Sequence, residues 1–135
     1  MKVVLILGSN KGIDIEHAKK ITDGLDENKI EWEQFSASAH KQAREALGIL
    51  DKFQNEKVVY VTIAGRSNAL SGFVAGNSDK VTIACPPFAD KLDMMVNINS
   101  TLQMPSGVPA MTILEPANVV LAIKRMIDLS LWTIL

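Results

Sequence analysis

Short apolar runs alternate along the chain with segments of helical spacing. Residues 3–7 are continuously apolar, which is typical of a parallel strand covered on both faces, and residues 58–64 form a second, β-branched run. Residues 30–36 alternate in polarity and predict an outer strand. Two shorter strands are predicted over residues 81–84 and 108–114.

The segments after these strands have the period of helices that pack on a sheet. The predicted helices cover residues 14–28, 42–53, 68–76, 94–102 and 117–129. In the first two, the inward side is expected to consist of Ile15, Ala18, Ile21, Thr22 and Leu25, and of Ala43, Ala46, Leu47, Leu50 and Phe53. Strand followed by helix, five times, predicts an α/β fold: a three-layer, doubly wound parallel sheet of the flavodoxin-like kind. The connections are short, so we expect residues 1–135 to form a single domain.

The charge balance narrows the class of partner. Fourteen basic and fifteen acidic residues give a formal net charge of −1, so no basic surplus indicates nucleic acid or a membrane surface. We therefore expect a small-molecule ligand. The single cysteine, Cys85, excludes an internal disulfide and a zinc cluster of cysteines. The N-terminal apolar run is too short for a signal peptide and no run is long enough to cross a bilayer, so we expect a cytoplasmic protein.

Ligands of doubly wound sheets bind beyond the carboxyl ends of the strands, so the residues at those ends are the candidates for chemistry. The first end brings Gly8, Ser9 and Asn10 to a helix start, where backbone N–H groups can approach a phosphate. Its glycine spacing fits neither a P-loop nor a dinucleotide fingerprint. A plain tight turn between strand and helix explains these residues equally well.

The second end carries a hydroxyl, an imidazole and an ammonium. Ser38, His40 and Lys41 stand where a helix is expected to begin. Histidine can carry a proton near neutral pH, and lysine can bind a carboxylate or phosphate. Alternatively, Ser38 caps the helix and His40 is merely an exposed residue of its first turn.

The third end places an arginine at the mouth of a buried strand. Arg66 is costly there unless it pairs with an anion, and its guanidinium suits a carboxylate or phosphate. Ser67 and Asn68 could instead cap the following helix.

The fourth end and the first helix offer less. Cys85 could act as a nucleophile with His40. A lone cysteine that ends an apolar strand is, however, far more often a small core residue. His17 is expected on the solvent side of its helix, and we assign it no role.

These segments, in this order, resemble one family: the phosphoribosylaminoimidazole (AIR) carboxylases, in the branch called class II. The shared motifs are Gly8-Ser9, Ser38-Ala39-His40-Lys41, Ala64-Gly65-Arg66-Ser67-Asn68, Cys85-Pro86-Pro87 and Pro105-Ser106-Gly107. Class I relatives, which are mutases of the N-carboxylated isomer, typically have Ser-Ala-His-Arg and a glycine-rich Ala-Gly-Ala-Gly-Gly loop. Lys41 and Arg66 therefore favour class II.

The resemblance implies an enzyme of purine biosynthesis that carboxylates 5-aminoimidazole ribonucleotide with carbon dioxide, using no cofactor and no metal. It implies that His40 transfers the proton and that Lys41 and Arg66 stabilise the phosphate or the new carboxylate. The implied substrate-binding residues are Gly8, Ser9, Asn10, Asp14, Ser38, Ala39, Gly65, Ser67, Asn68, Pro105 and Ser106. The resemblance also implies a homo-oligomer, with the octamer of family members as the candidate assembly.

Two departures from the family pattern leave alternatives open. The family's Gly-Ser-x-Ser-Asp is replaced by residues 8–14, where Asp14 either takes the aspartate's place at the ribose or caps the first helix. The apolar tail, residues 130–135, is expected to dock on its own domain or on another subunit. The alternatives are the class I mutase reaction and a degenerate member that binds a ribonucleotide without catalysis. A receiver domain is excluded because its acidic pair and its phosphoacceptor aspartate are missing.

Overall fold

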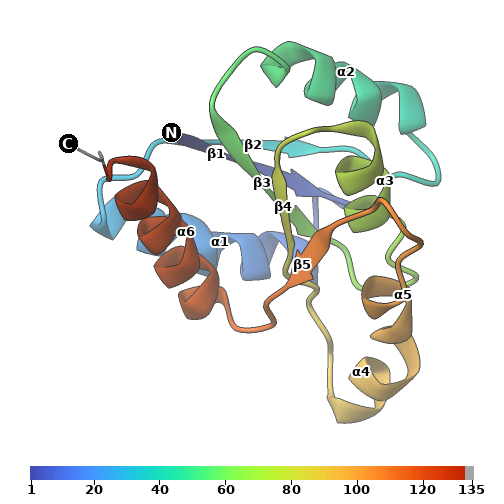
Figure 1. The fold of residues 1–135 in the computed structure, drawn as a ribbon. Helices are drawn as coiled ribbons and strands as arrows, with labels where there is room; N and C mark the ends of the chain where they lie inside the picture. The colour runs from blue at the N-terminus through green and yellow to red at the C-terminus, as the bar shows by residue number, and fades with distance from the viewer. Residues whose placement is uncertain (133–135) are drawn as a thin grey trace.

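The computed structural model describes residues 1–132, which form one five-stranded sheet flanked by helices (Figure 1). In chain order the elements are β1 (Lys2–Leu7), α1 (Ile13–Glu27), β2 (Trp32–Ser36), α2 (Ala43–Phe53), β3 (Val58–Ile63), α3 (Leu70–Asn77), β4 (Val81–Ala84), α4 (Lys91–Asn97), α5 (Asn99–Leu102), β5 (Ala110–Thr112) and α6 (Pro116–Ser130). All neighbouring strands are parallel, in the order β2-β1-β3-β4-β5. This is the flavodoxin-like order, so the predicted fold class is confirmed.

Helices cover both faces of the sheet (Figure 1). Because side chains alternate along a strand, Leu5 packs with Ile21 of α1 and Ile123 of α6. Its neighbour Val4 packs on the opposite face with Leu50 of α2. Residues 3–7 of β1 and all of β3 are buried, which explains why neither segment alternates between apolar and polar positions.

The predicted helices are found, but their buried faces are narrower than their spacing indicates. Ile15 is exposed because the inward line of α1 passes through its neighbour Asp14. In α2, Ala43 and Leu47 are exposed, because only one line of positions faces the sheet. The buried residues of α2 are Ala46, Leu50 and Phe53.

The predicted helix over residues 94–102 is two short helices, α4 and α5, which extend away from the sheet (Figure 1). α4 begins three residues earlier than predicted because the Asp90 side chain accepts a 2.8 Å hydrogen bond from the Asp93 N–H and so caps the helix. The last predicted strand is also shorter, covering only Ala110–Thr112.

The end of the described chain does not pack on its own domain. α6 begins at Pro116, one residue before the predicted start, and Leu131 and Trp132 beyond it are exposed. The remaining residues of the predicted docking tail, 133–135, lie outside the described residues. Within residues 1–132, no helix is both long enough and apolar enough to span a membrane.

Candidate active site

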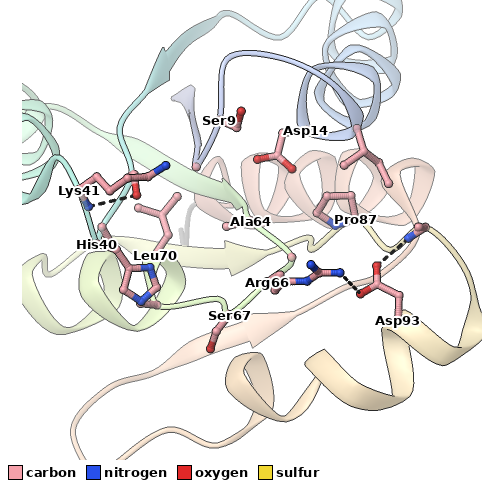
Figure 2. Close-up of a pocket in the computed structure, with 17 residues that line it drawn as sticks. Ser9, Asp14, His40, Lys41, Ala64, Arg66, Ser67, Leu70, Pro87 and Asp93 are labelled. Atoms are coloured by element: carbon pink, nitrogen blue, oxygen red, sulfur yellow. Dashed lines mark hydrogen bonds and ion pairs between the residues drawn. The ribbon is translucent and has the colours of Figure 1, made fainter.

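The connections that follow β1, β2, β3 and β4 surround a cavity of about 430 Å³ at the carboxyl edge of the sheet (Figure 2). α1 leaves β1 toward one face and α3 leaves β3 toward the other. The cavity therefore lies at the topological switch point, where open α/β sheets bind their ligands. Its lining residues are Gly8, Ser9, Ile13, Asp14, Ser38, Ala39, His40, Lys41, Ala64, Gly65, Arg66, Ser67, Ala69, Leu70, Pro87, Ala89 and Asp93.

A buried carboxylate lies beside the end of β1. Asp14 is only 8% exposed, and this burial raises the pKa of its carboxyl, while a hydrogen bond from the backbone N–H of Ser9 opposes the rise. Asp14 does not cap α1, because Gly12, with a φ of 67°, occupies the position before the helix. The carboxylate is left facing the cavity (Figure 2).

The turn after β2 holds the imidazole and the ammonium that the sequence predicts at this strand end. The Ser38 hydroxyl accepts a 3.2 Å hydrogen bond from the backbone N–H of Lys41. The backbone N–H of Ser38 donates to the Gln42 side chain at 3.1 Å. His40 therefore lies in a braced turn that precedes α2, and its imidazole and the Lys41 ammonium border the cavity from that side (Figure 2).

The loop after β3 forms the opposite wall. A Cβ atom at Gly65 would collide with the backbone carbonyl oxygen of Pro87, so the two connections approach as closely as only glycine allows. The Arg66 side chain is 79% exposed and lies 3.9 Å (Nη2 to Oδ1) from Asp93. The cost expected for an arginine at this strand end does not arise, because its guanidinium is solvated.

Asn68 anchors this loop from below and does not line the cavity. Its side-chain oxygen accepts the backbone N–H groups of Leu70 and Ser71, at 3.0 and 3.2 Å, at the start of α3. Its amide nitrogen donates to the hydroxyls of Ser71 and Thr101, both at 2.9 Å. The backbone N–H of Asn68 donates to Ser100 at 2.8 Å. The loop is thus tied to α3 and α5, which supports the helix-capping alternative for this residue.

Three other residues predicted to bind substrate lie outside the cavity. Asn10 is exposed in the loop between β1 and α1, and Pro105 and Ser106 are exposed in the turn before β5. The other predicted site residues are brought together around the cavity. They are Gly8, Ser9, Asp14, Ser38, Ala39, His40, Lys41, Gly65, Arg66 and Ser67.

Sequence reasoning missed two kinds of lining residue. Ile13 and Leu70 are apolar and belong to no motif, whereas Pro87 belongs to the Cys85-Pro86-Pro87 motif but was assigned no role in the site. Asp93 lies in α4, nine residues after the last residue of β4, where no motif marks it.

Cys85 is a core residue, as predicted. It is buried, with its sulfur 3.3 Å from Nε2 of His17 and 3.6 Å from the backbone oxygen of Leu114. Burial raises the pKa of the Cys85 thiol to about 12, which leaves almost no thiolate at neutral pH. The prediction of a solvent-facing His17 is wrong: its ring is half-buried against this sulfur, and burial lowers its pKa.

No group of three or more histidine, cysteine, aspartate or glutamate side chains within residues 1–132 could hold a metal ion. The ionisable side chains that line the cavity are an imidazole, an ammonium, a guanidinium and two carboxylates.

Comparison with known proteins gives a consistent family. The family model described as AIR carboxylase matches residues 2–132. The chain is 44% identical over 129 residues to the phosphoribosylaminoimidazole carboxylase of Archaeoglobus fulgidus, covering 96% of this chain and 70% of that protein. The corresponding protein of Treponema denticola is 41% identical over 129 residues, covering 94% of this chain and 79% of that protein. The crystal structure of Treponema denticola PurE superimposes with a TM-score of 0.87 at 41% identity, covering 94% of this chain and 80% of that one.

Proposed function

The chain belongs to the AIR carboxylase family, and on that basis we propose that it carboxylates 5-aminoimidazole ribonucleotide with carbon dioxide. The observation that carries this proposal is the cavity itself. It brings residues 38–41 against residues 64–67, with Ser9 and Asp14 at its third side. These segments supply hydroxyl groups and cationic side chains, which are the groups that bind a phosphate or a new carboxylate.

The reaction needs little from the protein beyond positioning, charge and one proton acceptor. The exocyclic amine of the substrate makes a ring carbon electron-rich, and this carbon forms a bond to the carbon of carbon dioxide. One C=O electron pair moves to oxygen, which creates the carboxylate and leaves a tetrahedral ring carbon. That carbon then loses its proton, and the ring becomes aromatic again.

We assign the proton transfer to His40, whose imidazole borders the cavity and has no hydrogen-bond partner within the described part of the chain. Lys41 and Arg66 stand on opposite walls (Figure 2), where they would stabilise the phosphate and the carboxylate. Ser9 and the N–H groups at the end of β1 would bind the phosphate, and Asp14 would accept hydrogen bonds from the ribose. Lys41 and Arg66 also favour the class II reaction over the class I mutase.

The test supplies the purified protein with aminoimidazole ribonucleotide and bicarbonate, with and without carbonic anhydrase, and follows the carboxylated product. Class II activity predicts product from dissolved carbon dioxide. Activity only on the N-carboxylated isomer would instead establish the mutase reaction. Nucleotide binding without turnover of either substrate would establish the degenerate alternative. The position of Asn10 outside the cavity is the observation that favours this alternative.

The two histidines of the chain provide a matched pair of variants. His40→Asn is expected to lower kcat by at least about 100-fold, because no other imidazole borders the cavity in the described residues. His17→Asn, the same substitution at a residue outside the cavity, is expected to retain most of the activity. Equal activity of the two variants would remove His40 from the mechanism.

We also propose that the protein is a homo-oligomer. α4 buries none of its side chains, and its apolar residues Leu92, Met95 and Val96 are largely exposed. Apolar surface of this kind usually marks an interface. Size-exclusion chromatography with light scattering measures the mass of the particle in solution. A monomer at micromolar concentration would contradict the proposal.

A further inference from the structure

A carboxylate outside every shared motif borders the cavity from α4. Asp93 is 19% exposed, and two donors hold it in place. The backbone N–H of Ala89 donates to its Oδ2 at 2.8 Å, and the Asn97 side chain donates to its Oδ1 at 2.6 Å. The hydrogen bond from Ala89 is the main reason that the pKa of Asp93 is lowered, so the group is ionised at neutral pH.

The side chain opposite Asp93 is that of Arg66, and within residues 1–132 its contact with Asp93 is the one ion pair that restrains it. The backbone of Arg66 is held by its neighbours, because Gly65 abuts Pro87 and Asn68 is anchored to α3 and α5. Its guanidinium, in contrast, has Asp93 as its one ion-pair partner within residues 1–132, at 3.9 Å. An arginine this exposed loses its fixed direction when its only partner is removed.

The pair contributes little to stability, because a loose ion pair with one solvated member is weak. Its geometry matters for the cavity instead. Figure 2 shows the Arg66 guanidinium turned toward Asp93, across the cavity from His40 and Lys41. A guanidinium has five N–H donors in a planar fork, so the contact with Asp93 leaves donors for a second anion.

We propose that Asp93 is a positioning residue, which holds the Arg66 guanidinium at the α4 side of the cavity so that its remaining donors can bind an anionic group of the substrate. The inference rests on the proposed carboxylation for the identity of that substrate. The contact between Asp93 and Arg66 does not depend on it.

The first measurement is NMR of the arginine side chains, which detects the Arg66 guanidinium itself and does not depend on enzymatic activity. The sequence contains three arginines, Arg44, Arg66 and Arg125, so the Nε–Hε signals of ¹⁵N-labelled protein are few. The Arg66 side chain is expected to be more ordered than the other two, which appears as a larger ¹⁵N–¹H heteronuclear NOE at its Nε. Asp93→Asn is expected to make it resemble them, and an unchanged Arg66 signal would overturn the proposal.

The control is Asp90→Asn, the same loss of charge three residues away. Asp90 caps α4 and does not line the cavity, and asparagine caps helices as well as aspartate does. This variant is expected to leave the Arg66 signal as it is in the unaltered protein. An equal effect of both variants would show a general charge effect and would overturn the specific role of Asp93.

The second measurement is a kinetic cycle. Asp93→Asn is expected to lower kcat/KM by about two- to fivefold when Arg66 is present, and to have no further effect in an Arg66→Ala background. Equal losses in both backgrounds would show that Asp93 acts without Arg66. If the unaltered protein carboxylates nothing while the Arg66 signal responds to Asp93→Asn, the proposed function fails and the positioning role stands.

Discussion

Replacing Asn68 by alanine removes four side-chain hydrogen bonds from beneath the cavity wall. The residue is 3% exposed, and its partner Thr101 is 1% exposed, so water cannot easily replace what is lost. The substitution therefore tests whether the loop that carries Arg66 is held by this network.

The expected cost follows from the individual contacts. The N–H groups of Leu70 and Ser71 lose a cap acceptor at the start of α3, which costs about 0.5–2 kcal/mol. The buried Thr101 hydroxyl loses its donor, which costs about 1–3 kcal/mol. Together they predict a loss of about 1.5–5 kcal/mol, a large part of the roughly 5–15 kcal/mol that stabilises a typical domain.

Urea unfolding of Asn68→Ala measures this loss, and Asn77→Ala is the matched control. Asn77 lies at the end of the same helix, is exposed, and makes one side-chain hydrogen bond, to the Phe73 carbonyl. Its replacement is expected to cost about 0.5 kcal/mol or less. If Asn68→Ala unfolds within about 1 kcal/mol of the control, the network does not hold the loop.

Three further predictions concern other residues. Gly65→Ala is expected to lower the free energy of unfolding by about 1–3 kcal/mol, because its Cβ meets the Pro87 carbonyl. Gly48→Ala, in an open position of α2, is expected to raise it by about 0.5–1 kcal/mol, and equal urea midpoints for both would contradict the packing argument. Because burial raises the pKa of Asp14 above its ordinary 3.8, the folded protein holds that proton more tightly and loses stability as the pH rises through this window. Asp14→Asn should therefore gain stability relative to the unaltered protein at pH 7 but not at pH 3, whereas a gain independent of pH would refute the assignment. The Cys85 thiol, with its pKa of about 12, should react with a thiol reagent at neutral pH only as fast as the protein opens, so immediate labelling of the folded protein would be the contrary result.

The sheet and most of the cavity could be predicted because they follow from simple periodicities. The apolar run of residues 3–7 in β1 and the β-branched run of β3 identify two inner strands of the sheet, since strands covered on both faces do not alternate in polarity. Parallel strands end at the same edge, so residues 38–41 and 64–67 had to lie near one another whatever the details of packing.

The rest depends on packing that no local pattern encodes. An asparagine before a helix suits a ligand as well as a cap, and Asn68 turns inward because α5 presents Thr101 to it. Asp93 reaches Arg66 only because the chain bends past Pro87 and α4 extends alongside the cavity. His17 is half-buried because the Cys85 sulfur lies beneath it, a contact between residues far apart in the chain.

The central position of β1 also determines when the cavity can form during synthesis. Val3 lies beside Trp32 of β2 and beside Val59 of β3, so the first strand has its outer neighbour long before its inner one. The loop that carries Arg66 is secured later still, because Asn68 needs Thr101 as its partner. A ribosome-bound chain that has exposed His40 but not yet released α5 therefore has one wall of the cavity without the other. Such non-local closure is a slow step in folding, and both walls of the cavity are secured only after Thr101 has been synthesised.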